Sequence, residues 1–166
     1  MLAGVVVLPL LAALAAPVVA RRFGRHAGWV LAPAPLVSAL PIIRALPLGP
    51  GESLLESFEW VPGLGVSLGF RLDGLSATFG LLVTGIGALI LIYAGGYLGD
   101  DRRLGRLLAT LLVFLGAMLG LVLADDVIAL FVFWELTSVC SFLLVGFDHE
   151  RAEARAAALK ALVVTA

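Results

Sequence analysis

Residues Val127 to Phe147 read VIALFVFWELTSVCSFLLVGF, a stretch of 21 residues with one charged side chain, Glu135. About 20 apolar residues in a helix cross the hydrocarbon core of a bilayer. The stretch therefore predicts a membrane-spanning helix with a carboxyl near the midplane, where a charge costs roughly 2.5–3.5 kcal/mol on insertion scales. Because that cost needs an offset, we interpret Glu135 as a proton or cation relay; the alternative is a structural carboxyl bonded to a neighbouring helix.

The polar side chains of this helix share one face. At 100° per residue they fall within an arc of about 160°. The arc holds Trp134, Glu135, Thr137, Ser138 and Ser141. The other side carries Val132, Leu136, Val139 and Leu143. In a membrane we expect the polar face to turn toward protein or water.

The composition is that of an integral membrane protein. Hydrophobic residues make up 61% of the 166 residues and charged residues 14%, against about 25% charged in soluble domains. The sequence contains no basic patch with interleaved aromatic residues, so we expect no nucleic-acid partner. The sequence shows no cluster of metal ligands, no Gly-rich phosphate loop and no Ser/His/Asp arrangement, so we expect no metal, no cofactor and no enzyme activity. The single cysteine, Cys140, is interpreted as a small packing residue.

Apolar runs divide the chain into five predicted spans and the start of a sixth. They cover residues 2–20, 27–48, 72–98, 107–124, 127–147 and 156–166. The predicted fold is an all-α integral membrane protein forming one membrane domain over residues 1–166. Positive charge follows the first run rather than preceding it, which favours a retained span over a signal peptide. The last run supplies only about 16 Å of helix, so we expect the N-terminal fragment of a longer subunit.

A different pattern separates the second and third spans. Val66, Leu68 and Phe70 are apolar at every second position, and Gly63-Leu64-Gly65 is a candidate turn. Residues 58–70 therefore predict a short β-hairpin.

Basic and acidic loops alternate along the chain. Arginines follow the first, third and fifth spans: Arg21, Arg22, Arg25, Arg102, Arg103, Arg106, Arg151 and Arg155. The second and fourth loops are acidic apart from Arg71. By the positive-inside rule the basic loops are cytoplasmic. We therefore expect a multi-pass protein of the cell (inner) membrane, with its N-terminus and the hairpin outside.

Three aspartates precede predicted helices. Asp73 starts the third span, with Arg71 as a candidate partner, and Asp125 and Asp126 form an acidic turn before the fifth. Helix capping is the favoured interpretation; attraction of cations at a pore mouth is the alternative. Lys160, roughly two turns into the last run, is expected to snorkel to the interface, to pair with a carboxylate such as Glu135, or to serve a hydrophilic channel.

Three blocks of sequence resemble a known family. They are WVP at 60–62 with FRLDGLS at 70–76, LVTGIG at 82–87 with YA at 93–94, and FWELTS at 133–138 leading into SFLLVGF at 141–147. Together they resemble the N-terminal part of the large A subunit of Mrp-type multi-subunit cation/proton antiporters, which is homologous to the distal antiporter-like subunit of respiratory complex I. The resemblance runs from about Trp60 to Ala166, and the Trp-Glu-Leu-Thr-Ser run favours the antiporter branch.

The resemblance implies roles for two residues. Glu135 aligns with a membrane glutamate thought to modulate a lysine in proton transfer, and Lys160 matches a lysine that is not the main relay of the family. The relay lysines of the family lie on later helices that these 166 residues do not include. The resemblance also implies other membrane subunits as partners, Na⁺ and H⁺ as transported ions, and chemistry without quinone or nucleotide.

Three hypotheses follow. The first is a subunit of a monovalent cation (Na⁺)/proton antiporter with Glu135 in the ion path. The second is a proton-pumping membrane subunit of an NADH:quinone oxidoreductase-type complex. The third is a membrane scaffold without transport, whose polar helix only docks against partners.

Overall fold

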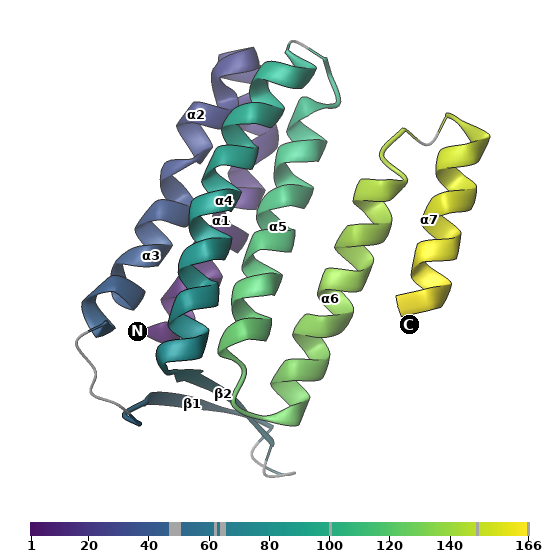
Figure 1. Cartoon of the computed structure of the whole chain (residues 1–166). Helices are drawn as coiled ribbons and strands as arrows, with labels where there is room; N and C mark the ends of the chain where they lie inside the picture. Colours follow the sequence, from purple (N-terminus) through teal and green to yellow (C-terminus); the bar gives the residue numbers. More distant parts are fainter. Residues whose placement is uncertain (47–50, 62, 64–65, 100, 149, 166) are drawn as a thin grey trace.

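Long helices lie side by side and a two-stranded sheet crosses one end of them in the computed structural model (Figure 1). The structure describes residues 1–46, 51–61, 63, 66–99, 101–148 and 150–165. The elements are α1 (Leu2–Phe23), η1 (Gly24–His26), α2 (Ala27–Leu31), α3 (Pro33–Ala45), β1 (Leu54–Val61), β2 (Val66–Leu72), α4 (Gly74–Leu98), α5 (Leu104–Leu123), α6 (Val127–Val145) and α7 (Ala152–Thr165).

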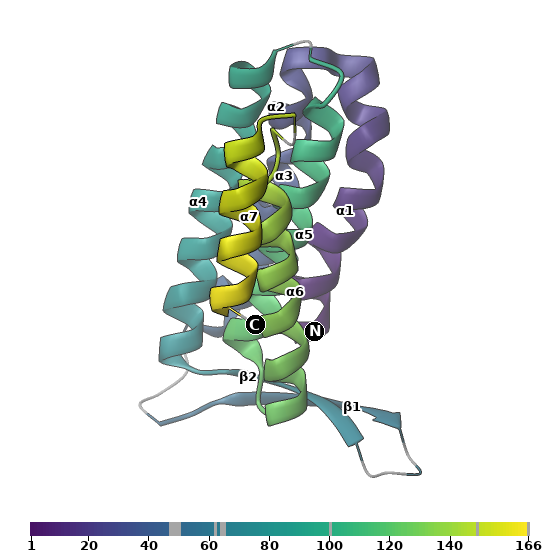
Figure 2. The same cartoon turned by 90° about the vertical axis from the view of Figure 1, so that its right-hand side faces the viewer.

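Four helical stretches of the described chain are long and apolar enough to cross a membrane, namely Leu2–Ala45, Gly74–Leu98, Leu104–Leu123 and Val127–Val145. The first of them doubles back. Gly24 has a φ of 50°, in the left-handed region that glycine adopts without steric cost, and α2 and α3 then return alongside α1 (Figures 1 and 2). The expectation of a mostly helical membrane protein is therefore confirmed, while the count of five spans stays a prediction.

The helix boundaries differ from the predicted spans at several points. The run at 27–48 is split, because Pro33 opens a separate helix at its first turn; residues 47 and 48 lie outside the described residues. α4 begins at Gly74 rather than Leu72, because Leu72 pairs in the sheet. α7 begins at Ala152, so its first turn includes the charged Glu153, whose carboxylate suits the N-terminal end of the helix dipole.

The hairpin is present and longer than predicted. β1 and β2 pair antiparallel from Leu54 with Leu72 to Val61 with Val66, with a register shift between Glu59 and Val61. The predicted turn at Gly63-Leu64-Gly65 includes residues 64 and 65, which lie outside the described residues. Phe70 and Leu72 are buried beneath the helix ends.

α5 is the central helix and packs against α1, α4 and α6. Its buried leucines recur every three or four residues: Leu104, Leu108, Leu112, Leu115, Leu119 and Leu123. Lipid tails are as apolar as leucine, so close packing rather than release of water holds such helices together. Glycines allow that closeness: a Cβ at Gly105 would lie 2.9 Å from the Cα of Pro17 on α1.

α6 and α7 extend in a row from α5, and α7 packs mainly on α6 (Figure 1). Only Ala129, Ser138 and Cys140 are buried on α6. The helix that carries Glu135 is therefore the least enclosed of the long helices.

Candidate functional site

Glu135 is the ninth of the 19 residues of α6, near the middle of the helix. Its side chain is half-buried, and Ser138 on the predicted polar face is 7% exposed. On the aliphatic side, Val139 is 46% exposed and Leu143 50%. Trp134 is an exception, because it belongs to the polar arc and is also 50% exposed. Most of the polar face is thus more enclosed than the aliphatic face, which is the arrangement that a bilayer favours.

The rotation of α6 is set by Phe133. A Cβ placed on Gly120 of α5 would lie 2.4 Å from the ring of Phe133, so the ring fills the space that glycine leaves. Glu135 follows two residues later, about 200° around the helix. Its carboxyl therefore lies on the side of α6 away from α5.

Lys160 lies on α7, which runs antiparallel to α6 and packs against it (Figure 1). Glu135 lies ten residues before Val145 at the end of α6, and Lys160 eight residues after Ala152 at the start of α7. Measured from the end of the bundle where α6 ends and α7 begins, Glu135 lies at a depth of about 15 Å and Lys160 at about 12 Å. The two depths differ by less than one helical turn. Lys160 is exposed, and no ion pair joins these two described residues. The structure therefore brings the two residues to a similar depth without an ion pair between them.

Asp73 is the N-cap of α4. Its carboxylate accepts a hydrogen bond of 2.9 Å from the Ser76 N–H, and the Ser76 hydroxyl accepts one of 2.8 Å from the Asp73 N–H, which completes a capping box. These bonds from the Ser76 backbone and hydroxyl hold the pKa of Asp73 below its usual value of 3.8. Burial opposes them with a smaller effect, and the charge of Arg71 lowers the pKa by less than burial raises it.

Replacing Asp73 with alanine is expected to lower the stability of the protein by about 1 kcal/mol at neutral pH, since an N-cap contributes about that much. Because the folded pKa is depressed, the stabilisation is present above about pH 4 and is lost as the pH falls through the lower folded value. Thermal unfolding in detergent at pH 7 and at pH 3 measures this difference. Asp73→Asn keeps a capping oxygen and should lose less; an equal loss in both variants would contradict the assignment.

Asp125 and Asp126 differ in their contacts. Asp126 is the N-cap of α6, and its Oδ1 accepts a hydrogen bond of 2.7 Å from the Ala129 N–H. Asp125 instead forms an ion pair with Arg71, whose Nε lies 2.5 Å from its Oδ1. Arg71, the candidate partner of Asp73, therefore bonds to Asp125. Attraction of cations by these aspartates stays a prediction.

Sequence reasoning missed the role of Glu56. Its carboxylate on β1 accepts hydrogen bonds from the Met1 ammonium and the Leu2 N–H, and one of 3.2 Å from the Ala3 N–H, which covers the start of α1. Burial raises the pKa of Glu56, but these bonds outweigh it and leave the pKa below its usual value. From the sequence, the acidic character of this loop served only to predict orientation.

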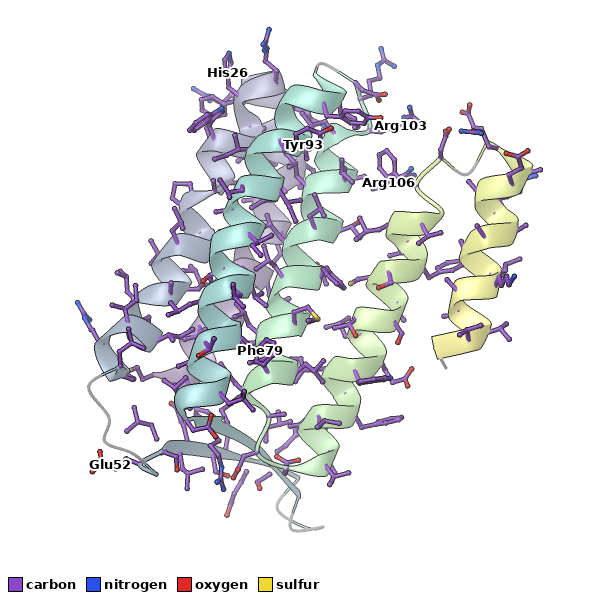
Figure 3. The ribbon with its side chains drawn as sticks, in the orientation of Figure 1. His26, Glu52, Phe79, Tyr93, Arg103 and Arg106 are labelled. Atoms are coloured by element: carbon purple, nitrogen blue, oxygen red, sulfur yellow. The ribbon has the colours of Figure 1, made fainter. Side chains whose placement is uncertain are left out.

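Sequence reasoning also used the arginines of the third loop only to infer orientation. Arg103 donates a hydrogen bond of 3.0 Å to Asp101 and one of 3.2 Å to Asp148, between α6 and α7. Hydrogen bonds from Arg103 hold the pKa of Asp101 below its usual value. The guanidinium of Arg106 lies 5.0 Å from the ring centre of Phe147. Figure 3 shows Arg103, Arg106 and His26 at one end of the helices and Glu52 at the other.

No group of three metal-ligating side chains comes together among the described residues. Cys140 is free and buried within α6. The candidate site therefore consists of Glu135, its polar neighbours on α6, and Lys160 at similar depth.

Two family models match the chain. Residues 59–107 match the N-terminus of chain 5 of NADH-ubiquinone oxidoreductase (complex I), and residues 124–166 match the transmembrane region of NADH:quinone oxidoreductase and Mrp antiporter proteins. The chain belongs to this family of antiporter-like membrane subunits. The quoted blocks at 60–76, 82–94 and 133–147 lie within the two matched regions, so the resemblance inferred from them is confirmed.

The relatives that match most of this chain include antiporter subunits. The chain is 42% identical over 162 residues to "Na(+)/H(+) antiporter subunit A1" of Staphylococcus aureus strain JH9, and equally to that of strain Newman, over 96% of this chain. It spans 20% of the length of each of these relatives.

Solved structures share the fold. A chain in the structure of the Mrp complex from Dietzia sp. DQ12-45-1b has a TM-score of 0.88 and 39% identity, over 98% of this chain and 17% of that one. A chain of the membrane-bound sulfane sulfur reductase, an archaeal respiratory membrane complex, has a TM-score of 0.71 at 22% identity, over 94% and 24% of the two chains. The second likeness concerns the fold alone.

Proposed function

We propose that this chain is part of a subunit of a multi-subunit monovalent cation/proton antiporter, in which Glu135 contributes a membrane-embedded carboxyl to the path of Na⁺ or protons. The observation that carries the proposal is a half-buried carboxyl in the middle of α6, in a chain 42% identical to a Na⁺/H⁺ antiporter subunit. Other membrane subunits would complete the path.

The charge state of Glu135 depends on what lies beside its carboxyl. In the hydrocarbon core a carboxyl is stable as the neutral acid, or as a carboxylate with a cation beside it. Movement of a proton or cation past Glu135 changes which state is favoured. Lys160 at similar depth on α7 supplies a candidate ammonium for this exchange, because a shift of α7 or of its side chain would bring the two charges together.

The same proposal includes the topology. Five spans and the start of a sixth, with the N-terminus outside, would make residues 1–166 one membrane domain of a longer subunit in the cell membrane. Support comes from the placement of His26, Arg103 and Arg106 at one end (Figure 3), where the positive-inside rule expects the cytoplasm, and from the match to a fifth of each relative.

The complex I-type pump is the second candidate, favoured by the match of residues 59–107 to the chain 5 N-terminus. Vesicles containing the complete complex distinguish the two. An antiporter should dissipate an imposed pH gradient when NaCl is added without an electron donor. Proton movement only with NADH and quinone present would replace the first proposal with the second.

A further inference from the structure

The connection between α5 and α6 is bound to the edge of β2, although the two are far apart in sequence. The Gly69 carbonyl accepts a hydrogen bond of 2.9 Å from the Asp125 N–H, and the Gly69 N–H donates one of 2.7 Å to Oδ2 of Asp126. Phe70 and Ala124 form an isolated antiparallel bridge. Residues 124–126 thus extend the edge of the hairpin, and the carboxylate of Asp126 takes the place of the next carbonyl.

The carboxylate of Asp126 therefore accepts hydrogen bonds from two elements, α6 and β2. Oδ1 accepts from the Ala129 N–H in the first turn of α6, and Oδ2 accepts from the Gly69 N–H on β2, each at 2.7 Å. An ionised carboxylate has two acceptor oxygens and suits both donors, whereas an asparagine amide offers one oxygen and one NH₂. The space is also restricted: a Cβ at Gly69 would lie 3.2 Å from Oδ2 of Asp126.

Phe133 provides a second contact between the hairpin and α6. Its ring centre lies 6.1 Å from that of Phe70 on β2, with the ring planes tilted by 48°, and its ring also fills the space at Gly120 of α5. Asp126 holds the start of α6 along the helix axis, and Phe133 holds its rotation. Glu135 lies nine residues after Asp126, about 13 Å along the helix, so both contacts determine where its carboxyl lies.

We propose that Asp126 is a positioning residue for Glu135. By joining the edge of the hairpin to the first turn of α6, it fixes the depth of Glu135 relative to the bundle of α1 to α5. This inference rests on the proposed function of Glu135. Loss of the Asp126 carboxylate bond to the Gly69 N–H leaves the bond from the Asp125 N–H as the remaining hydrogen bond between Gly69 and this turn. Because α6 is otherwise weakly enclosed, the helix can then shift while its own hydrogen bonds persist.

Asp126→Asn tests the proposal in the complete complex, because asparagine is as good an N-cap as aspartate but cannot also accept from Gly69. The exchange rate per assembled complex is expected to fall roughly tenfold, since misplacement by about 1 Å costs up to 10²-fold in aligned reactions. Alkylation of the buried Cys140 by N-ethylmaleimide, located by peptide mass spectrometry, is expected to rise roughly threefold or more as α6 loosens. Glu59→Gln removes an exposed carboxylate from the same hairpin and should change neither.

The two measurements separate this inference from the proposed function. Wild-type Cys140 labelling in Asp126→Asn would overturn the link, and increased labelling with an unchanged rate would overturn the positioning of Glu135. Retained exchange in Glu135→Gln would instead overturn the proposed function, and Cys140 labelling would still decide whether Asp126 holds α6.

Discussion

Replacing Glu135 with glutamine is expected to reduce Na⁺-driven proton exchange by the complete complex about a hundredfold, the lower end of what a positioned proton-transfer group contributes. Glutamine keeps the size and polarity of the side chain but can neither carry a proton on an oxygen nor hold a cation by charge. The helix itself should persist, because the α6 contacts of Asp126 and Phe133 do not involve Glu135. The measurement is the initial rate of gradient dissipation by NaCl in vesicles, divided by the amount of assembled complex.

Glu153→Gln is the matched control. Glu153 lies in the first turn of α7 with its side chain 88% exposed and an ion pair of 3.3 Å to Arg151, and an exposed pair of this kind contributes at most about 1 kcal/mol. Its rate should stay at the wild-type level. If Glu135→Gln also retained the wild-type rate but reduced the amount of assembled complex, Glu135 would be a structural carboxyl and the scaffold hypothesis would be favoured.

Local sequence patterns predicted the helices. The features that these patterns did not predict, such as the start of the hairpin, depend on contacts between residues far apart in the chain. The one-charge run at 127–147 predicted α6 within two residues at its C-terminal end, because length and hydropathy are properties of the segment alone. The hairpin begins at Leu54 rather than residue 58, since Leu54 to Ser57 show no alternation and Glu56 finds its donors on α1.

In the candidate site too, some features follow from local sequence and others depend on long-range contacts. Periodicity placed Glu135 and Ser138 on one face of α6, but the side of the helix that faces α5 depends on Phe133 meeting Gly120. The acidic turn indicated a cap at Asp126, and nothing local connects it with Gly69, 57 residues away. One sequence alone does not show which glycine, far away in the chain, a given side chain will contact.

Gly28→Ala is expected to destabilise the protein by about 3 kcal/mol, the upper end of the usual cost of overpacking. A Cβ at Gly28 on α2 would lie 2.1 Å from the carbonyl oxygen of Leu91 and 3.0 Å from the Cα of Ile92, both on α4. These are backbone atoms, so no side chain can rotate away, and the helices must separate. Gly95 makes the reciprocal approach, with its Cβ position 2.8 Å from the Arg25 carbonyl oxygen.

Gly85→Ala is the control for this prediction. Gly85 lies on α4, the helix that Gly28 of α2 contacts, and a Cβ at Gly85 meets nothing within 4 Å. In a helix interior, alanine is more stable than glycine by roughly 0.5–1 kcal/mol, so this variant should unfold at or above the wild-type temperature in detergent. Gly28→Ala should unfold several degrees below it and yield less assembled complex. Equal unfolding temperatures would show that α2 and α4 do not approach each other through Gly28, and that the return of the chain alongside α1 is held by other contacts.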